Sequence, residues 1–406
     1  MSAILIRDAR VASLDHGASP RRGAAMGDLT ALDGCDVLIE DGSIAQVGAG
    51  LTAPDNTEII DADGRVCMPG FVDAHTHAVW AGDRLDEIDL RQRGASYLDI
   101  LASGGGIMST VRAVRAASRE RLAANLRRRL GTALREGTTT IEVKSGYGLT
   151  TADELKSLHA IEDAARGFAG TVIPTALIAH AIDPEQPSFV ETTINETLPA
   201  VHEAFPEVAI DAYCERGAWS LEDCRRLFVA AGELGHPMRV HADQFNALGM
   251  VDLAIEMGFR TVDHLEATGP EALARLAASD TIGVMLPASG FQVDDRYADG
   301  RALLDAGGSL VIATNCNPGS APTSSVPFVI ALATRKLGLT TAEAISACTI
   351  NAAAALGLPD RGVIAPGMRA DLILLRHRDE RMLGYEFGGD PVACVICGGQ
   401  LVRPLA

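Results

Sequence analysis

The stretch P-G-F-V-D-A-H-T-H, residues 69–77, is the most informative part of this chain. A Pro-Gly break precedes a short apolar run, and the run ends in two histidines separated by one residue. In an extended strand alternate side chains share a face, so His75 and His77 are expected to project together, with Asp73 on their side and Thr76 pointing away. Two parallel imidazoles form half of a tetrahedral or five-coordinate metal site. The alternative, an ordinary pair of loop histidines, is disfavoured by the Pro-Gly break and the buried-type run.

Strand-like runs alternate with helix-like stretches through the middle of the chain. The predicted strands cover residues 70–77, 138–144, 171–179, 208–215, 238–241, 260–264, 282–286 and 309–314. Helical periodicity is found between them, at residues 119–136, 151–166, 221–234, 249–257 and 270–278. Eight parallel units of this kind close most naturally into a (β/α)8 barrel of the TIM type. An open doubly wound sheet is the second interpretation.

Both ends of the chain are instead rich in short strands and turns. Strand-like runs occur at residues 3–6, 36–40, 44–47, 58–61, 371–375, 391–396 and 401–403, and Asp41-Gly42 is a hairpin signal. A chain of 406 residues exceeds the size at which a single core usually stops growing. We therefore expect a composite small β-sandwich domain from residues 1–64 and 362–406, and a barrel domain over residues 65–361.

Composition excludes several classes of partner. The formal charge of −18, from 53 acidic and 35 basic residues, argues against nucleic acid and anionic membranes, which require a basic surface. An anionic small molecule remains compatible if arginines surround it locally. The N-terminus lacks the apolar core of a signal peptide, and no apolar run is long enough to cross a membrane. The eight cysteines are scattered, which fits a reduced compartment, so a cytoplasmic protein is expected.

In a barrel of this type, active-site residues lie at the carboxyl ends of the strands. Five of the ten histidines occupy predicted strand ends, together with other polar residues. In chain order the residues at these ends are His75, His77, Lys144, Tyr147, His180, Glu215, His241, His264 and Asn315. This concentration of histidines indicates a metal-dependent hydrolase.

These residues match a known family. The chain resembles the amidohydrolase superfamily over nearly its whole length, through the 69–77 motif, the histidines closing strands five and six, and the split β-domain. Within it the chain resembles the hydrolases that open the imidazolone ring in histidine degradation. That narrower resemblance rests on R-G-A-S-Y-L-D-I-L at 93–101, G-G-G-I-M-S-T-V-R at 104–112, E-V-K-S-G-Y-G-L at 142–149, H-A-D-Q at 241–244 and N-P-G-S at 317–320.

The resemblance implies a mononuclear site in which His75, His77 and His241 hold one zinc or iron ion, with Asn315 at the position of a further ligand. It implies hydrolysis of 4-imidazolone-5-propanoate to N-formimino-L-glutamate, with the metal generating the nucleophile and acting as a Lewis acid. His264 is expected to polarise the carbonyl, and Gln244 to assist. The residues expected around this carboxylate-bearing substrate are Arg84, Tyr147, His180, Gln244, Asn317, Gly319 and Ser320.

The chain departs from the family at Asn315, because the family normally has an aspartate there that also carries a proton. An amide oxygen can coordinate a metal, but an amide cannot act as a general base. Three explanations stay open: an engineered replacement, a natural variant using another base, or a relative that binds without hydrolysing. Asn315 is therefore predicted to lower turnover while sparing substrate binding.

Two other functions are kept as alternatives. One is a deaminase or deiminase acting on a related cyclic or formimino compound, because the same barrel and metal ligands serve both reactions. The other is a non-catalytic ligand-binding relative, which only Asn315 supports. The family further suggests a homodimer.

Overall fold

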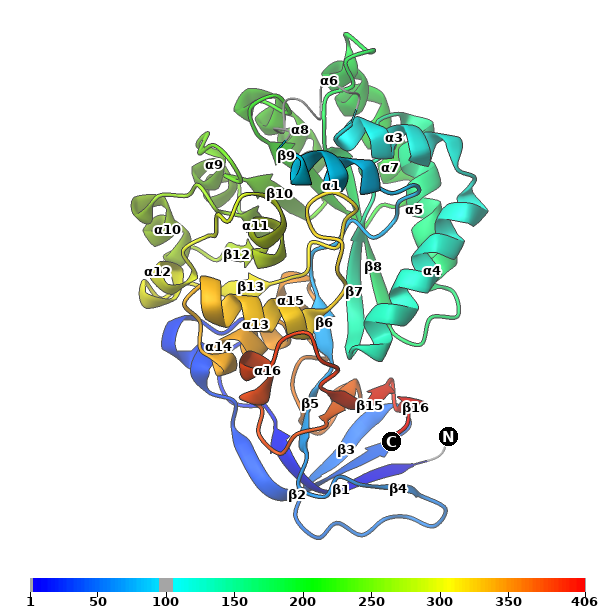
Figure 1. The fold of residues 1–406 in the computed structure, drawn as a ribbon, viewed down its shortest axis with the longest axis vertical. Helices are drawn as coiled ribbons and strands as arrows, with labels where there is room; N and C mark the ends of the chain where they lie inside the picture. Colours follow the sequence, from blue (N-terminus) through cyan, green and yellow to red (C-terminus); the bar gives the residue numbers. More distant parts are fainter. Residues whose placement is uncertain (1–2, 95–104, 406) are drawn as a thin grey trace.

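The computed structural model describes residues 3–94 and 105–405. Part of the string at 93–101, and Gly104 of the glycine run, lie outside the described residues. Figure 1 shows a large barrel surrounded by helices and, at one end of it, a smaller sheet that carries both termini. The helix-rich part of the molecule comes from the middle of the chain.

Eight parallel strands form the barrel, in the order β13-β12-β11-β10-β9-β8-β7-β6. Their bounds are β6 Phe71–Asp73, β7 Thr138–Lys144, β8 Thr171–Ala179, β9 Ala209–Cys214, β10 Met238–Ala242, β11 Thr261–His264, β12 Ile282–Met285 and β13 Leu310–Ile312. The predicted (β/α)8 barrel is confirmed. The doubly wound alternative is wrong, because the strands follow one another in sequence order around the sheet.

The first barrel strand is shorter than predicted, since it ends at Asp73 rather than at His77. After that point the backbone turns to the last strand. Thr76 forms an isolated parallel bridge with Cys316, and the Thr314 hydroxyl donates to Asp73 Oδ2 over 2.5 Å. These contacts join the first strand to the last, so His75 and His77 lie where the barrel closes.

Helices cover the outside of the barrel and begin with ordinary capping signals. Ser118, Thr150 and Ser220 each accept a backbone N–H of the first turn of the following helix. The longer helices are α3 Ile107–Ala116, α4 Arg119–Arg135, α5 Thr151–Ala165, α8 Leu221–Glu233 and α13 Val326–Lys336. The shorter ones are α1 Leu85–Gln92, α6 Phe189–Thr192, α7 Leu198–Ala204, α9 Met250–Glu256, α10 Pro270–Ala277, α11 Pro287–Val293, α12 Gly300–Asp305, α14 Thr341–Ala347, α15 Ile350–Ala355 and α16 Met382–Tyr385. A 3-10 turn at Gly23–Gly27 and a π-helical turn at Thr193–Thr197 complete the set.

The second sheet is mixed and draws its strands from both chain ends, as predicted. Its strands are β1 Ile4–Ala12, β2 Ala31–Glu40, β3 Ser43–Gly48, β4 Glu58–Asp61, β5 Val66–Pro69, β14 Leu372–Leu375, β15 Val392–Cys397 and β16 Gln400–Arg403. Strand β1 pairs with β2, β4 and β5, and β5 pairs with β14. Asp41 and Gly42 both have positive φ and form the β2–β3 hairpin turn. We propose the division into these two domains, with the second boundary near residue 362; because β5 belongs to the second sheet, we place the first boundary after Pro69 rather than at residue 64.

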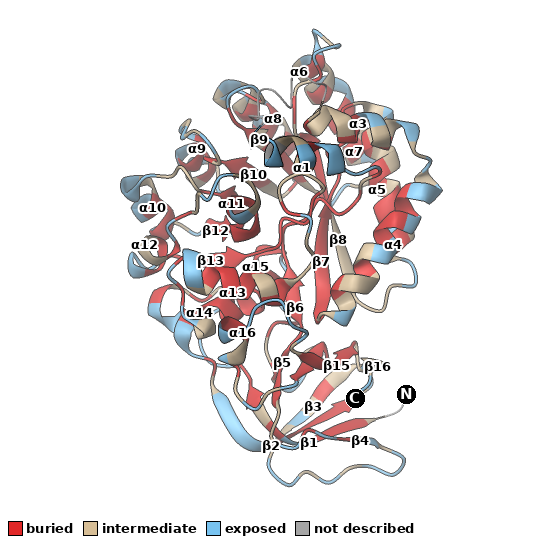
Figure 2. Cartoon of the chain, viewed as in Figure 1, coloured by how far each residue is buried: buried red, intermediate tan, exposed pale blue. Residues whose placement is uncertain are grey.

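Burial follows this layering. Figure 2 shows buried residues along the barrel strands, and exposed residues on the outer sides of helices such as α9, α10 and α12. The small sheet has an apolar core of its own, which includes Ile6, Val37, Leu372 and Ile396. None of the helices within residues 3–94 and 105–405 has the length and apolarity needed to cross a bilayer.

Candidate active site

Histidine rings from distant parts of the sequence meet at the carboxyl end of the barrel. His75 and His77 follow β6, and His241 lies in β10. The Nε2 atom of His77 lies 3.3 Å from that of His75 and 3.2 Å from that of His241. Ring nitrogens of His75, His241 and His264, which ends β11, lie within 4.8 Å of one another. The strand-end histidines therefore face one point.

Two buried carboxylates hold the outer nitrogens of these rings. Asp263 Oδ2 lies 2.6 Å from His75 Nδ1, and Asp211 Oδ1 lies 3.1 Å from His241 Nδ1. When Nδ1–H donates to the carboxylate, the lone pair on Nε2 of the same ring points to the common centre. Burial lowers the pKa of His75, His77 and His241, so all three rings are neutral at physiological pH.

This arrangement fits a metal better than it fits hydrogen bonds among the rings. Two lone pairs cannot bond to each other, and His77 Nε2 carries at most one proton, so it can donate to only one neighbour. A tetrahedral zinc ion with bonds of ~2.0–2.1 Å places neighbouring nitrogens ~3.3 Å apart. The observed separations are 3.3 Å and 3.2 Å. His75, His77 and His241 are thus suited to hold a metal ion.

A cluster of fully buried charges supports the histidines from inside the barrel. Lys144 Nζ lies 2.7 Å from Glu142 Oε1 and 2.7 Å from Asp211 Oδ2. Arg239 Nη2 lies 3.1 Å from Asp263 Oδ2, and its Nη1 lies 3.5 Å from Glu142 Oε1. The two carboxylates that orient the histidines are therefore themselves held by cations. Because Lys144 is already paired in this way, its contacts do not suit a carboxylated lysine bridging two metals.

Replacing Lys144 with methionine is expected to lower the free energy of unfolding by about 3–5 kcal/mol, because the buried carboxylates lose a charge partner. Lys336→Met is the matched control, since Lys336 pairs with Asp295 over 2.9 Å at the surface. A change within about 1 kcal/mol is expected there. Denaturant titration followed by circular dichroism measures both. Similar losses for the two variants would contradict a structural role for the buried cluster.

Asn315 lies just after β13, at the position where the family resemblance predicts an aspartate. Its backbone N–H donates to the His75 carbonyl over 3.0 Å, and its φ of 57° lies in the left-handed region that Asn and Asp tolerate. Its Oδ1 atom is buried and has no hydrogen-bond partner among the described residues. Such an oxygen at the metal-binding end of the barrel suits coordination by an amide, although it offers no base.

His264 lies in a strained segment beside this centre. Its φ is 90° and that of Leu265 is 73°, values that are costly for both residue types and typical of functional sites. Nδ1 of His264 lies 3.1 Å from Glu266 Oε1. The contact to Glu266 orients this ring beside the other histidines.

Arg84 supplies the local positive charge that an anionic ligand requires. Its Nε donates to Thr110 Oγ1 over 3.0 Å, and its Nη1 lies 3.8 Å from Glu87 Oε2. The guanidinium passes directly over Gly319, where a Cβ atom would lie 2.5 Å from Nη1. A Cβ at residue 319 would require the guanidinium to shift, so glycine at this position leaves room for Arg84 where it lies.

Tyr147 and His180 form a second wall of the site. Their ring centroids are 5.2 Å apart, and His180 stacks on His77 with centroids 4.9 Å apart. His180 Nδ1 lies 3.0 Å from the Gly146 carbonyl oxygen, to which it donates, so its Nε2 is an acceptor. Burial lowers the pKa of His180 to about 3 and raises the pKa of Tyr147, which keeps the imidazole neutral and the phenol protonated.

The loop of residues 317–320 is shaped by one side chain. Asn317 Oδ1 accepts the backbone N–H groups of Gly319 and Ser320 over 2.8 Å and 2.7 Å. Its Nδ2 donates to the Asn315 carbonyl over 2.6 Å and to Ser320 Oγ over 2.9 Å. Both ends of the Asn317 amide therefore bond within the loop, and Ser320 is held at the cavity wall.

Gln244 has a partner that sequence reasoning missed. The Tyr213 hydroxyl donates to Gln244 Oε1 over 2.8 Å, and Gln244 Nε2 lies 3.4 Å from Ser289 Oγ. The hydrogen bond from Tyr213 fixes the orientation of the Gln244 amide, so that Nε2 is its donor.

The sequence analysis also did not predict Asp211 and Asp263 as site residues. Metal-bound histidines usually have a carboxylate behind them, so acidic residues near the strand ends were the available signal.

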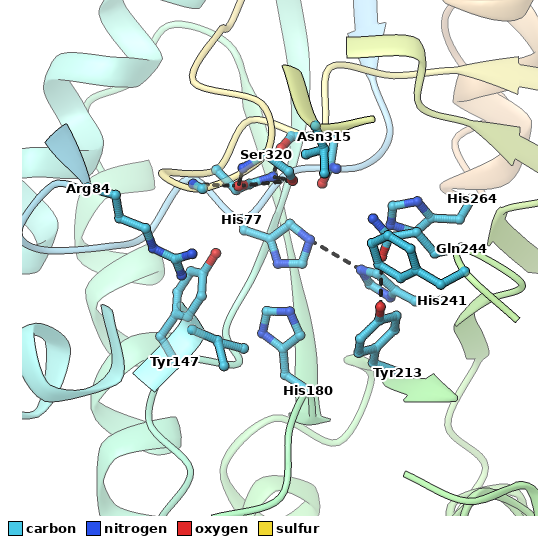
Figure 3. A pocket seen from close by; sticks show the side chains of 15 residues that line it. His77, Arg84, Tyr147, His180, Tyr213, His241, Gln244, His264, Asn315 and Ser320 are labelled. Carbon is cyan, nitrogen blue, oxygen red and sulfur yellow. Dashed lines mark hydrogen bonds between the residues drawn. The ribbon is translucent and has the colours of Figure 1, made fainter. Parts of the chain in front are cut away.

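These side chains enclose a cavity of about 140 Å3. Figure 3 shows Arg84 and Tyr147 on one side of it, Gln244 and His264 on the other, and His77 between them. All predicted site residues except His75 line the cavity, and Tyr213, Phe245, Ile107 and Val293 line it as well. The structure therefore brings together residues that the sequence placed at separate strand ends.

Comparison with known proteins agrees with this geometry. A model of the amidohydrolase family matches residues 58–103 and 87–403. The imidazolonepropionase of Herpetosiphon aurantiacus is 46% identical over 400 residues, which is 95% of this chain and 94% of that protein. The imidazolonepropionase of Deinococcus deserti is 45% identical over 382 residues, covering 94% of this chain and 95% of that protein.

Solved structures show the same fold at low identity. N-isopropylammelide isopropylaminohydrolase from Burkholderia multivorans aligns with a TM-score of 0.74 and 20% identity, over 100% of this chain and 99% of that one. A zinc complex of atrazine chlorohydrolase from Arthrobacter aurescens aligns with a TM-score of 0.72 and 19% identity, over 99% and 95% of the two chains. The chain belongs to the amidohydrolase family and, within it, to the imidazolonepropionases.

Proposed function

We propose that this chain hydrolyses the cyclic amide of 4-imidazolone-5-propanoate to N-formimino-L-glutamate in histidine degradation, using one zinc or iron ion. One observation carries the proposal: a single cavity has converging histidines on one wall and Arg84 on the opposite wall. A substrate with a hydrolysable ring and a short carboxylate arm matches this cavity, because the ring can lie against the histidines and the carboxylate against Arg84. The named relatives, which are imidazolonepropionases, support the same reaction.

His75, His77 and His241 would hold the metal, with the amide oxygen of Asn315 as a further ligand. When bound, the metal supplies Lewis acidity and a nucleophile derived from water at neutral pH. The neutral state of the three rings suits this role, as do the hydrogen bonds that Asp263 and Asp211 accept from His75 and His241. Histidine together with amide oxygen is compatible with zinc and with iron.

The propanoate carboxylate would bind at the Arg84 side of the cavity. Arg84 offers a charge-assisted hydrogen bond, and the protonated phenol of Tyr147 and the hydroxyl of Ser320 add neutral donors. All three residues line the same cavity. This part of the site would hold the substrate by its arm, so that the ring lies against the histidines.

The ring would be held by groups with defined donor and acceptor roles. His180 Nε2 can accept from a ring N–H, because its Nδ1 already donates to Gly146. Gln244 can donate from Nε2, because Tyr213 donates to its oxygen. We further propose that Asn317 and Gly319 contribute by shaping the loop that presents Ser320 and leaves room for Arg84.

Asn315 cannot take up the proton released during hydrolysis. His264 is the cavity residue placed to move that proton, because its Nδ1 contacts Glu266 and its other nitrogen faces the remaining histidines. Because the usual aspartate is absent, turnover is nevertheless expected to be low, while substrate binding is retained.

Replacing Arg84 with methionine is expected to raise KM about 10- to 100-fold, because the carboxylate loses a hydrogen bond to a charged donor. The assay follows 4-imidazolone-5-propanoate and N-formimino-L-glutamate by mass spectrometry on metal-loaded protein. Arg119→Met is the matched control, since Arg119 pairs with Asp163 over 2.6 Å away from the cavity. An unchanged KM in Arg84→Met would remove Arg84 from the carboxylate site.

The same assay separates the other functions. Release of ammonia from the cyclic substrate would identify a deaminase. Binding of 3-(imidazol-4-yl)propanoate with no bound metal and no product would identify a non-catalytic relative. Formation of the formimino product with one metal per chain supports the proposal, and two metals per chain would overturn the mononuclear site.

We also propose a cytoplasmic location and a homodimer. All eight cysteines are buried and unpaired, which suits a reducing compartment. The homodimer rests on the family resemblance. Sedimentation velocity on the purified protein tests the dimer, and fluorescent tagging tests the location.

A further inference from the structure

One buried carboxylate touches none of the residues assigned to chemistry above. Glu154 is the fourth residue of α5 and is 1% exposed. A glutamate in the first turn of a surface helix usually reaches solvent. Here the side chain instead turns back across the start of its own helix, toward the loop that follows β7. Burying a carboxylate is costly unless hydrogen bonds compensate for the lost water.

The compensation comes from three backbone N–H groups of the loop that contains Tyr147. Glu154 Oε2 accepts the Gly146 N–H over 2.8 Å, and Oε1 accepts the Gly148 and Leu149 N–H groups over 2.7 Å and 2.8 Å. The carboxylate thus binds the residues on both sides of Tyr147. Charge-assisted hydrogen bonds of this kind are roughly twice as strong as neutral ones.

The loop can wrap the carboxylate only because of its glycines. A Cβ at Gly148 would lie 2.5 Å from the backbone nitrogen of Glu154, and Gly146 has a φ of 109°. The S-G-Y-G-L string is therefore built around Glu154, with Tyr147 as the one large side chain directed to the cavity.

A second contact carries the effect to His180. The Gly146 carbonyl accepts the hydrogen bond from His180 Nδ1, and the N–H of the same residue, Gly146, donates to Glu154. A Cβ at Gly146 would lie 3.0 Å from that Nδ1 atom. The position of Gly146 therefore determines both the tautomer of His180 and how closely its ring approaches Tyr147.

We propose that Glu154 is a positioning residue for substrate recognition: its carboxylate places the Tyr147 hydroxyl and, through the Gly146 carbonyl, presents His180 Nε2 as an acceptor. This inference rests on the proposed function for the identity of the ligand. It assigns Glu154 no contact with substrate. The consequence is that affinity for a propanoate-bearing imidazole depends on a residue outside the cavity.

The test uses Glu154→Gln, which keeps the size of the side chain but replaces one acceptor oxygen with a donor. The dissociation constant of 3-(imidazol-4-yl)propanoate, measured by calorimetry, is expected to rise about tenfold, while the metal content is unchanged. Glu154→Asp keeps the charge, but its side chain is too short to reach all three N–H groups. It is also expected to raise the dissociation constant, and it replaces the glutamine variant in the test if that variant does not fold.

A matched control separates positioning from loss of stability. Glu343 is also buried near the start of a helix and accepts the backbone N–H of Thr340 over 2.7 Å, but it lies outside the cavity lining. Glu343→Gln is expected to lower the melting temperature and leave the dissociation constant within about twofold. In a Tyr147→Phe background the effect of Glu154→Gln on binding is expected to shrink, because the two residues act through one group.

Crystal structures of the parent and of Glu154→Gln decide the inference independently of turnover. Displacement of Tyr147 and His180 in the variant supports it, and unmoved rings would overturn it. If the parent protein binds no propanoate-bearing imidazole, the proposed function is wrong, and the two crystal structures still decide whether Glu154 positions these rings.

Discussion

Replacing Asn315 with aspartate is expected to raise kcat for opening of the imidazolone ring by about 10²- to 10⁴-fold, the range that a positioned proton carrier contributes. The amide oxygen is buried at the histidine centre and is unpaired within the part of the chain that the structure describes. A carboxylate in its place can accept a proton, and the left-handed backbone at this position suits aspartate equally well. KM is expected to change little, because Arg84 and Tyr147 are untouched.

Initial rates at saturating substrate measure this effect on protein with the same metal content. Asn195→Asp makes the same chemical change on an exposed side chain of the π-helical turn and is expected to have no effect. Equal kcat values for the parent and Asn315→Asp would contradict the prediction. They would mean that another group, with His264 the first candidate, already carries the proton efficiently.

Replacing His241 with alanine is expected to abolish metal binding and to lower kcat by about 10³-fold or more, because the metal contributes several kcal/mol to such reactions. His241 Nε2 lies 3.2 Å from His77 Nε2, and its loss leaves only His75 and His77 of the three proposed histidine ligands. Asp211→Asn keeps the ring but replaces the carboxylate behind it. Metal affinity is then expected to fall about 10- to 100-fold.

Metal content by mass spectrometry and kcat on the same samples give the measurement. His159→Ala removes a histidine that lies outside the cavity lining and pairs with Glu162 over 3.4 Å, and it is expected to retain metal and activity. Full metal occupancy in His241→Ala would show that this ring is not a ligand. An unchanged metal affinity in Asp211→Asn would show that the carboxylate behind the ring is dispensable.

The repeat of strand and helix was readable from the sequence because each barrel strand is buried on both faces. Such strands appear as apolar runs bounded by helical periodicity. Thr138–Lys144 and Thr171–Ala179 begin and end where the sequence predicts. β6 departs most from the prediction, because the contacts of Thr76 and Asp73 with the segment after β13 depend on barrel closure, which local sequence does not contain.

The sequence by itself determined the residue types at the strand ends, and hence a histidine-rich site beside an arginine and a tyrosine. Strand order in a barrel makes such a site inevitable, since all the carboxyl ends lie on one face. Only the tertiary structure decided how these groups are oriented. Most of the contacts that orient them join elements distant in sequence: Asp263 and Asp211 accept from the histidines, and Tyr213 donates to Gln244. The contact of Glu154 with the loop around Tyr147 is local, but it requires the chain to fold back on itself. Hydrogen-bond direction and histidine tautomer depend on such contacts, and no periodicity in the chain records them.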